Sequence, residues 1–327
     1  MSITLEPVRA SLDLVREELE RRWPDGRDRL DAMCRHALLP SGKLLRPLLL
    51  LESAAAVGGD RTQVVPAALA VEYLHGASLI HDDVIDGDRL RRGRESVMAR
   101  YGVDDAIVAG DALFMASATA LAECGHLGVP AAAVVTALRL FGEAGIRLCR
   151  GQVEESAQQG ALDAGLPAYL AMVEGKTGAL FRAACVAGVV LGGGSTSDQV
   201  AAAAYAGHLG IAFQMYDDLL PYLRDSATTG KAAGSDLANR RPTFPVLVAA
   251  ELAPGRRGEL AAILHSGAPG ALARMSELLH GIGAIEHARR LATAEAGHAI
   301  AALAAFPPSD STAFLASVAE LVVDRER

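Results

Sequence analysis

Three aspartates stand close together shortly before residue 90. Asp82, Asp83 and Asp86 follow a mostly apolar run, residues 77–80. On a helix, Asp82 and Asp86 share one face, because residues four apart are neighbours there. Carboxylates at this spacing repel one another unless cations lie between them, and Mg²⁺ prefers oxygen ligands of this kind. The cluster therefore predicts a magnesium site at the end of a buried helix, rather than a solvated helix end.

A basic cluster follows these aspartates. Arg89, Arg91, Arg92 and Arg94 all stand within eight residues of Asp86. Guanidinium groups donate paired hydrogen bonds to phosphate oxygens. Arginines alone would be interpreted as solvated surface, but acids followed by bases in one short segment indicate a site for a metal-bound diphosphate.

A second acidic pair, Asp217 and Asp218, stands in the C-terminal half. Four residues after Asp217 comes Pro221, which lacks the N–H that a helix interior needs, so we expect it to kink or end the helix. Asp225 returns to the face of Asp218 if the helix resumes. Lys231, in a glycine-containing loop, is either a diphosphate contact or a surface lysine. Two acidic clusters with bases nearby suggest two walls of one cleft that holds three metal ions and a diphosphate, and that ionises an allylic carbon–oxygen bond.

The elements that position these groups are expected to be helices. Alanine and leucine, both strong helix formers, supply most of the apolar residues, whereas aromatic residues make up only 4%. Apolar positions at helical spacing fill the segments between short breaks rich in glycine and proline. Segments 179–191 and 199–213 are apolar on most faces, which is typical of helices in the middle of a bundle. The predicted fold is all-α: a single orthogonal helical bundle over residues 1–327 with a central cleft.

Charge and cysteine placement argue against several classes of function. The formal net charge is −8, so no basic surplus exists to neutralise nucleic-acid phosphates. The four cysteines form no CxxC pair, which argues against a zinc or redox motif and fits reduced thiols in a cytoplasmic protein. The N-terminal segment has no apolar signal core. The longest run without acids, lysine or arginine, 199–216, contains His208 and two glutamines. It predicts a core helix, and we expect no transmembrane segment.

From about Pro40 to the C-terminus, the ordered motifs resemble the trans-isoprenyl diphosphate synthase family, also called polyprenyl synthetases. GKLLRP at residues 42–47 is similar to the family's GKxxRP segment. DDLLPYLRDS followed by TTGKA is similar to DDLLGIWGDP and TGKP of actinobacterial members, which include geranylgeranyl diphosphate synthase-like chains. The resemblance implies the isoprenoid synthase fold. It also implies a prenyltransferase that condenses isopentenyl diphosphate head to tail with dimethylallyl, geranyl or farnesyl diphosphate.

The resemblance further implies a role for each matching residue. The residues that hold isopentenyl diphosphate are Lys43, Arg46, His75 and Arg92. The allylic diphosphate is held by Arg91. Three Mg²⁺ ions per active site are held by Asp82, Asp83, Asp86, Asp217 and Asp218. The polar residues that line the reaction centre are Gln152, Lys176, Thr177 and Gln214. Lys231 is a further diphosphate ligand, and the pair Gly110-Asp111 matches a structural segment.

Three positions depart from the family pattern. Pro221 stands where a third aspartate is usual, Glu155 where many members have an aspartate, and Arg241 where a lysine is common. These departures concern the third metal site and the catalytic rate more than the fold.

Small residues before the first aspartate bear on product length. The residues four and five before it are Ser78 and Ala77. One helical turn rises about 5.4 Å, close to one extended isoprene unit, so a bulky residue there would act as a floor for the growing chain. The small side chains predict an open shaft with its floor one turn deeper, at Leu74, and geranylgeranyl diphosphate as the product. The expected neighbours on another helix are Phe114 and Met115; ordinary core packing is the alternative interpretation of all these residues.

Two other functions remain open from the sequence. A class I terpene cyclase on the same fold needs the first aspartates but no isopentenyl diphosphate site. Condensation is favoured by Lys43, Arg46, His75 and Arg92. A non-catalytic subunit of a heteromeric synthase is compatible with the altered second motif, whereas Arg91 and Arg92 argue against it. Family members usually dimerise, so the resemblance implies a homodimer.

Overall fold

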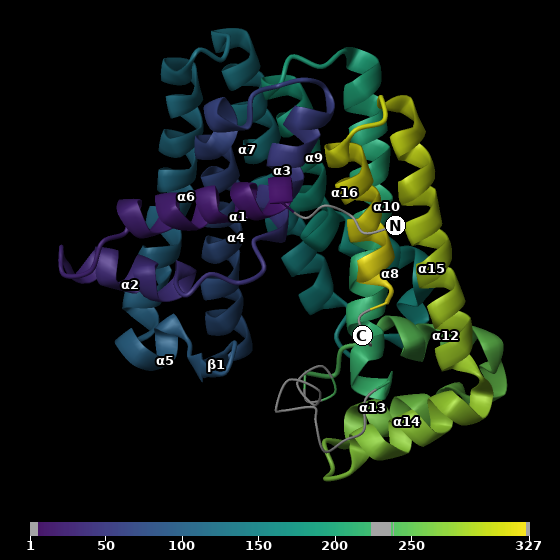
Figure 1. Cartoon of the computed structure of the whole chain (residues 1–327). Coiled ribbons are helices and arrows are strands. Elements are labelled where there is room, and N and C mark those ends of the chain that lie inside the picture. The colour runs from purple at the N-terminus through teal and green to yellow at the C-terminus, as the bar shows by residue number, and fades with distance from the viewer. Residues whose placement is uncertain (1–5, 224–236, 238, 325–327) are drawn as a thin grey trace. The chain divides into compact units, whose positions relative to one another are not determined.

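The computed structural model describes residues 6–223, 237 and 239–324, and helices dominate them (Figure 1). The α-helices are α1 (Glu6–Arg22), α2 (Arg29–Leu38), α3 (Leu45–Ala56), α4 (Arg61–Asp86), α5 (Val97–Tyr101), α6 (Val103–Glu123), α7 (Ala131–Ala157), α8 (Gly165–Val173), α9 (Ala179–Leu191), α10 (Thr196–Leu223), α12 (Phe244–Leu252), α13 (Arg257–Ser266), α14 (Ala271–Ile282), α15 (Ala284–Ala302) and α16 (Asp310–Val322). The prediction of an all-α fold is confirmed.

Short elements join these helices. The 3₁₀ turns are η1 (Cys124–Leu127), η2 (Leu162–Ala164), η5 (Pro254–Arg256) and η6 (Leu303–Ala305), and η3 (Glu174–Gly178) is a π-helical turn between α8 and α9. Within the described residues, the strands β1 (Leu90–Arg91) and β2 (Arg94–Glu95) form a two-stranded antiparallel hairpin, and no other strand occurs.

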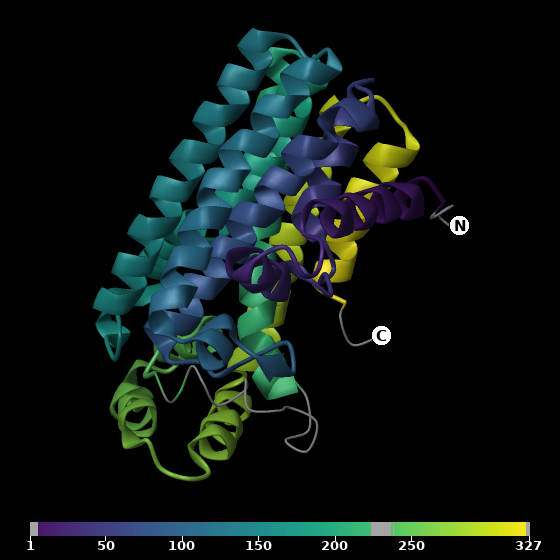
Figure 2. The same ribbon diagram turned by 90° about the vertical axis from the view of Figure 1, so that its left-hand side faces the viewer.

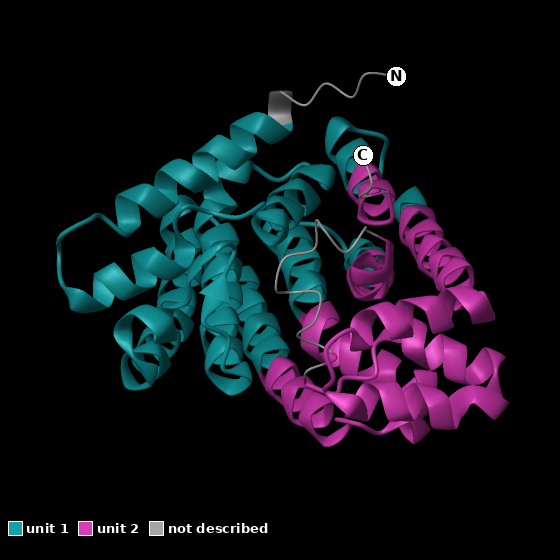
Figure 3. Cartoon of the chain, turned by 90° about the horizontal axis from the view of Figure 1, so that it is seen from below, with its two compact units in different colours: residues 1–145, 180–203, 303–315 teal, residues 146–179, 204–302, 316–327 magenta. Residues whose placement is uncertain are grey.

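The chain gathers into two compact units (Figure 3). Unit 1 comprises residues 1–145, 180–203 and 303–315, and unit 2 comprises residues 146–179, 204–302 and 316–327. Each unit is therefore assembled from segments far apart in the sequence. The single domain over residues 1–327 and the central cleft stay predictions.

In unit 1, α4 and α6 lie side by side (Figure 2). Gly110 on α6 lies against His81 on α4: a Cβ added at Gly110 would lie 2.2 Å from the Nε2 atom of His81. Five residues before His81 on α4, a Cβ added at Gly76 would lie 3.4 Å from the Cδ1 atom of Leu113 on α6. Because residue numbers rise on α6 as they fall on α4, the two helices are antiparallel. The His81 imidazole explains why the position at Gly110 carries no side chain.

A second close approach in unit 1 joins α3 to α9. A Cβ added at Gly188 would lie only 2.3 Å from the carbonyl oxygen of Leu50. The two backbones can meet at this distance only because the residue on α9 is glycine. Nearly every residue of α9 is buried, so the prediction of a central helix over 179–191 is confirmed.

The core of unit 2 is formed by residues of α8, α10, α12, α13, α14 and α15. Its largest buried side chains include Tyr216 and Phe244. The rings of Tyr169 and Phe244 stack with centroids 5.6 Å apart, which ties α8 to α12. This packing holds the part of α10 that carries the second acidic pair.

Helix α10 runs through Pro221 and continues to Leu223. The proline therefore falls in the last described turn, where a missing N–H costs one helical hydrogen bond but does not stop the helix at that residue. Asp225 and Lys231 lie outside the described residues, so the resumption of the helix and the lysine contact stay predictions.

Two helical segments are long and apolar enough to meet a length and hydropathy criterion for a membrane span, Arg61–Asp86 and Val103–Leu127. In the first, 83% of the apolar window is buried within the structure, as in a core helix; in the second, 39% is buried. The 199–216 run that the sequence singles out is part of α10 and is mostly buried or half-buried.

Candidate active site

The first three aspartates lie in the last two turns of α4, which ends at Asp86. The carbonyl groups of a helix C-terminus carry partial negative charge, so three carboxylates there are unfavourable without cations. Asp82 and Asp86 are both partly exposed, whereas Asp83 is only 3% exposed. The local fold thus concentrates negative charge at one helix end and leaves two carboxylates accessible to a ligand.

Asp83 is held by Arg91. The Nε atom of Arg91 donates to the Oδ1 atom of Asp83 at 2.8 Å, and the Nη2 atom of Arg91 donates to the same oxygen. Burial raises the pKa of Asp83, and the guanidinium opposes that rise. A cavity of about 30 Å³, lined in part by Gly76, Asp83 and Arg91, lies beside the pair and has room for a water molecule.

The hairpin determines where two arginines lie. Arg92 and Gly93 form its two-residue turn, and both have positive φ, 52° and 79°. Turns of this kind match the twist of the two strands that they connect. The turn brings the guanidinium of Arg92 against Gly42, where an added Cβ would lie 2.7 Å from its Cζ atom. The hairpin therefore joins the basic cluster to the GKLLRP segment, which is far from it in sequence.

Arg46 lies in the first turn of α3, whose N-terminus has no side-chain cap. Its Cζ atom lies 4.6 Å from the centroid of the Phe181 ring, a cation–π contact. Its Nε atom is buried and has no hydrogen-bond partner among the described residues. Burial lowers the pKa of Arg46 to about 10, with a further lowering from Arg92. A half-buried guanidinium whose buried Nε donor has no partner among the described residues indicates a site for an anion.

Glu72 and His75 stand one turn apart on α4, beside these cations. Burial, and then the charges of Arg46 and Arg92, lower the pKa of His75 well below its usual value, so the imidazole is neutral near pH 7. Glu72 is 5% exposed, and burial raises its pKa while the two arginines oppose the rise. The structure thus brings together Arg46, His75 and Arg92 as the sequence predicts, and Lys43 is exposed just before α3.

Sequence reasoning missed Glu72. The sequence does mark Glu72, because it is a charged residue within the mostly apolar run AVEYLHG of a buried helix. Buried carboxylates are rare unless they are paired, so its position pointed to a nearby cation.

In unit 2 the second acidic pair lies on α10. Asp217 is exposed, whereas Asp218 is 7% exposed. Asp218 accepts hydrogen bonds from the hydroxyl of Tyr169 at 2.9 Å, the backbone N–H of Phe244 at 2.9 Å and the amide of Gln214 at 2.8 Å. Three donors fix the carboxylate group. Tyr169 was not found from the sequence, because it lies 49 residues away on α8 and no local pattern marks it.

The π-helical turn η3 carries Lys176 and Thr177. The hydroxyl of Thr177 donates to the side-chain oxygen of Gln214 at 2.8 Å, which links η3 to Asp218 through one amide. Single π turns inside helices occur frequently at functional sites. The structure therefore brings together three of the predicted polar residues of unit 2, Thr177, Gln214 and Asp218, in one hydrogen-bonded chain.

Glu155 is the centre of a second group in unit 2. Its Oε2 atom accepts from the Nζ atom of Lys176 at 2.7 Å and lies 3.4 Å from the Nη2 atom of Arg241. Two of the departures from the family pattern, Glu155 and Arg241, are thus partners of each other. Gln152, one turn before Glu155, has a buried side-chain oxygen without a hydrogen-bond partner among the described residues.

The predicted shaft residues are partly in the expected place. Ala77 is fully buried, Leu74 is 7% exposed, and the hydroxyl of Ser78 donates to the carbonyl of His75 at 2.8 Å. Met115, by contrast, is 69% exposed on α6. It therefore does not pack in the core of this chain beside Leu74.

The helix register explains the misplacement. The ring of Phe114 packs against His81, with centroids 5.7 Å apart, at the level of the aspartates rather than of Leu74. Because α4 and α6 are antiparallel with Gly76 beside Leu113, the residue of α6 nearest to Leu74 lies further along, near the buried Ser117. The sequence alone could not supply this register.

The donor chemistry of both groups fits hard divalent cations. Asp82, Asp86 and Asp217 present carboxylate oxygens at least partly to solvent, and their buried neighbours are fixed by hydrogen bonds. Mg²⁺ takes one or two carboxylates together with phosphate oxygens and waters. The arrangement can therefore hold a metal-bound diphosphate at each acidic group, although the roles of the individual residues stay predictions.

Comparisons with known proteins agree with this chemistry. The family model "Polyprenyl synthetase" matches residues 27–280. The chain is 36% identical over 292 residues to a short chain isoprenyl diphosphate synthase of Methanothermobacter thermautotrophicus, covering 89% of each chain. It is 35% identical over 295 residues to a geranylgeranyl diphosphate synthase of Mycobacterium tuberculosis, covering 88% of this chain and 81% of that protein. Other relatives are named for farnesyl and octaprenyl diphosphate.

The fold leads to the same family. The crystal structure of geranylgeranyl pyrophosphate synthetase from Pyrococcus horikoshii matches with a TM-score of 0.89 and 31% identity, over 98% of each chain. The prediction of the family from the GKLLRP segment and the two acidic motifs is confirmed. This chain belongs to the polyprenyl synthetase family and is a prenyl diphosphate synthase.

Proposed function

We propose that this chain makes geranylgeranyl diphosphate by adding isopentenyl diphosphate head to tail to dimethylallyl, geranyl or farnesyl diphosphate. The observation that carries the proposal is the basic group of unit 1 formed by Arg46, His75 and Arg92. The Nε donor of Arg46 is buried and has no partner among the described residues. The imidazole of His75 is neutral near pH 7. A synthase needs such a second diphosphate site in addition to the carboxylate group, whereas a terpene cyclase does not.

The allylic diphosphate is assigned to the acidic groups. Asp82, Asp86 and Asp217 would hold Mg²⁺, three ions per active site, with Asp83 and Asp218 as the fixed members of each pair. Bound Mg²⁺ stabilises the diphosphate as a leaving group. Arg91 adds donors to the leaving oxygens while it keeps Asp83 in place. Lys231, outside the described residues, is assigned to the same diphosphate.

The basic group of Arg46, His75 and Arg92 would orient isopentenyl diphosphate. Arg46 and Arg92 would bind its phosphate oxygens with Lys43, and the neutral imidazole of His75 would donate one hydrogen bond without a further positive charge. The allylic carbon–oxygen bond ionises, and the double bond of isopentenyl diphosphate then attacks the resulting allylic cation. The new bond leaves a positive charge on the isopentenyl unit, which is discharged when a proton passes to the released diphosphate.

The hydrogen-bonded chain of unit 2 would serve the charge that develops in this step. The hydroxyl of Thr177 and the amide of Gln214 are oriented by each other and by Asp218. Preorganised dipoles of this kind stabilise a developing cation because they need no rearrangement during the reaction. Lys176, paired with Glu155, would bind diphosphate oxygens, and Gln152 would line the same centre.

Product length is assigned to the face of α4 below the aspartates. Ala77 and Ser78 leave room for the tail, and Leu74 one turn deeper would form the floor. The register of α4 and α6 makes Ser117 a better neighbour for that floor than Phe114 or Met115. The expected product therefore has twenty carbons.

We place the enzyme in the cytoplasm as a homodimer. On α6, the apolar side chains of Ile107, Val108 and Met115 are 43%, 54% and 69% exposed. We assign the dimer interface to them. Apolar residues gathered on one exposed helix face favour association with another protein surface. Light scattering should give twice the mass of one chain.

The function is tested by product analysis with matched variants. The purified chain is incubated with Mg²⁺, isopentenyl diphosphate and each allylic primer, and products are identified by mass. We expect a twenty-carbon diphosphate from the wild type and mainly a fifteen-carbon one from Ser78→Phe, because the ring fills the shaft one turn below Asp82. Ser78→Ala is the control, since it removes the hydroxyl without adding bulk, and its product should be unchanged.

Three outcomes would contradict this assignment. An unchanged product from Ser78→Phe removes the floor model. Cyclic hydrocarbons from an allylic substrate alone favour a class I terpene cyclase. No product with any primer indicates a non-catalytic subunit of a heteromeric synthase.

A further inference from the structure

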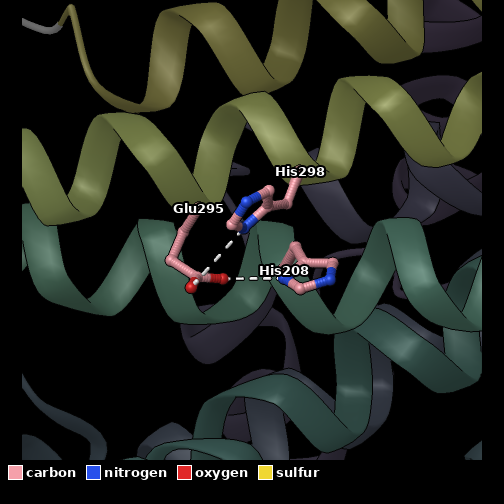
Figure 4. A group of neighbouring side chains, drawn as sticks. All are labelled: His208, Glu295 and His298. Carbon is pink, nitrogen blue, oxygen red and sulfur yellow. Dashed lines mark hydrogen bonds and ion pairs between the residues drawn. The ribbon is translucent and has the colours of Figure 1, made fainter.

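Two histidines and a glutamate converge in unit 2, away from the residues assigned above. His208 comes from α10, and Glu295 and His298 stand one turn apart on α15 (Figure 4). The Nδ1 atom of His208 lies 2.7 Å from the Oε2 atom of Glu295, and the Nδ1 atom of His298 lies 3.9 Å from its Oε1 atom. The two imidazole rings have centroids 5.2 Å apart. Both rings therefore face one carboxylate.

The separations suit a small coordination sphere. One ligand atom from each residue can be chosen so that all lie within 4.8 Å of one another. In a tetrahedral shell with bonds of about 2.0–2.1 Å, ligand atoms lie about 3.3 Å apart. One observed distance is shorter than this value and the other longer. The two observed distances, 2.7 and 3.9 Å, lie within about 0.6 Å of it.

The contacts are poorly explained as hydrogen bonds alone. Glu295 makes a short bond to His208, but at 3.9 Å the nitrogen of His298 is too far for a second one. His298 is 61% exposed, so apart from its contact with the ring of His208 little packing fixes its position. Two residues three apart on one helix with a third on the facing helix is a ligand arrangement that helical bundles use for metals.

We propose that His208, Glu295 and His298 bind one zinc-type divalent ion that ties α10 to α15, with a water molecule as the fourth ligand. Two imidazoles and one carboxylate select Zn²⁺ over Mg²⁺, because Mg²⁺ prefers an all-oxygen shell. The absence of a CxxC pair argues against a zinc site with thiolate ligands. The proposed site has no cysteine ligand, so that argument does not apply to it.

The ion would act as a structural brace. His208 precedes Asp217 by nine residues on the same helix, a distance of about 13 Å along the axis. The ion therefore lies too far away to contact the diphosphate directly. It would instead fix the segment of α10 that leads to the second acidic pair. The site does not depend on the proposed reaction.

Calorimetric Zn²⁺ titration of the full chain tests the site. Every variant carries Cys149→Ser, because Cys149 is exposed and thiols bind zinc. Excess Mg²⁺ occupies the aspartate groups. We expect one equivalent of Zn²⁺ to bind, and His298→Ala to bind it at least about tenfold more weakly. The matched control is His287→Ala, on the same helix but outside the cluster, which should bind zinc as the parent does.

Thermal unfolding gives a second readout. Zn²⁺ at a hundred times its dissociation constant should raise the unfolding midpoint of the parent by about 4 °C, and the shift should vanish in His298→Ala. Because His298 is largely exposed, this variant should fold. The proposal is overturned if no Zn²⁺ binds in excess Mg²⁺, or if His298→Ala and His287→Ala bind it equally well.

Discussion

The two acidic pairs have the same sequence, Asp-Asp, but the protein holds them in different ways. In each pair the second aspartate is buried, 3% exposed for Asp83 and 7% for Asp218. Asp83 is held by the guanidinium of Arg91. The donors to Asp218 among the described residues are neutral: a phenol, a side-chain amide and a backbone N–H.

The difference concerns charge. Neutral donors orient a carboxylate without cancelling its charge, whereas a guanidinium cancels one unit. In unit 1 the guanidinium of Arg91 faces two carboxylates, since it also lies 3.9 Å from Asp88, whereas the described donors to Asp218 carry no formal charge. We predict that the pair on α10 binds metal even though Pro221 stands where a third aspartate is usual. The two groups should bind metal comparably.

The largest expected effect tests that equality. Asp82→Asn and Asp217→Asn should each lower kcat by about 10³-fold, because each removes an accessible carboxylate ligand and several kcal/mol of leaving-group stabilisation. Steady-state rates at saturating Mg²⁺ measure the effect. Near-normal turnover in Asp217→Asn alone would show that the second pair does not hold metal, and that the departure at Pro221 matters.

The next effect concerns the charged partner. Arg91→Met should lower the free energy of unfolding by about 2 kcal/mol, because Asp83 loses a charge-assisted hydrogen bond while it stays buried. Urea unfolding measures the loss. Arg89→Met, an exposed arginine just before the hairpin, is the control and should change little. Adding Asp83→Asn to Arg91→Met should restore most of the loss; a double variant no more stable than Arg91→Met contradicts this account.

A smaller effect is expected from the neutral partner. Tyr169→Phe should lower the free energy of unfolding by about 1 kcal/mol, since Asp218 keeps the hydrogen bonds from Gln214 and from the backbone of Phe244. Tyr101→Phe, in unit 1, keeps its ring contacts and serves as the control. If Tyr169→Phe costs as much as Arg91→Met, the contrast between charged and neutral partners is wrong.

The smallest expected effect is the contribution of the neutral His75 to the pH dependence of stability. The folded-state pKa of His75 lies well below its unfolded value, so the unfolded chain binds the extra proton. Stability is then complete above about pH 6.5 and falls as the pH drops from there towards the folded pKa. His75→Gln should remove this part of the slope, by less than about 1 kcal/mol between pH 7 and 6. Unfolding midpoints measured across that range check it; identical slopes in both proteins refute it.

The sequence predicted what depends on local spacing. The helix that carries Asp82 and Asp86, the central helix 179–191 and the all-α class follow from residues close together in the chain, and the structure confirms the helices. The neighbourhood of Arg46, His75 and Arg92 came from a family resemblance, not from spacing. The hairpin that delivers Arg92 to Gly42 has only two residues in each strand, too few to give a pattern.

What the sequence could not supply depends on contacts between distant segments. Tyr169 reaches Asp218 across 49 residues, and the register of α4 and α6 decides that Met115 is exposed instead of buried beside Leu74. The π turn at Glu174–Gly178 also has no local signature. One extra residue in a single helical turn leaves no recognisable pattern of apolar and polar residues in the sequence.

The close approach of α3 and α9 has a consequence for how this protein can evolve. Gly188 leaves no room for a Cβ beside the carbonyl of Leu50. Every amino acid that one base change can reach from a glycine codon carries at least a Cβ. Arg46 lies one turn from Leu50, and its contact partner Phe181 lies two turns from Gly188. Any substitution at Gly188 would therefore push α3 and α9 apart and disturb the contact between Arg46 and Phe181, and no substitution on α3 could relieve this, because the obstructing atom is a backbone carbonyl oxygen.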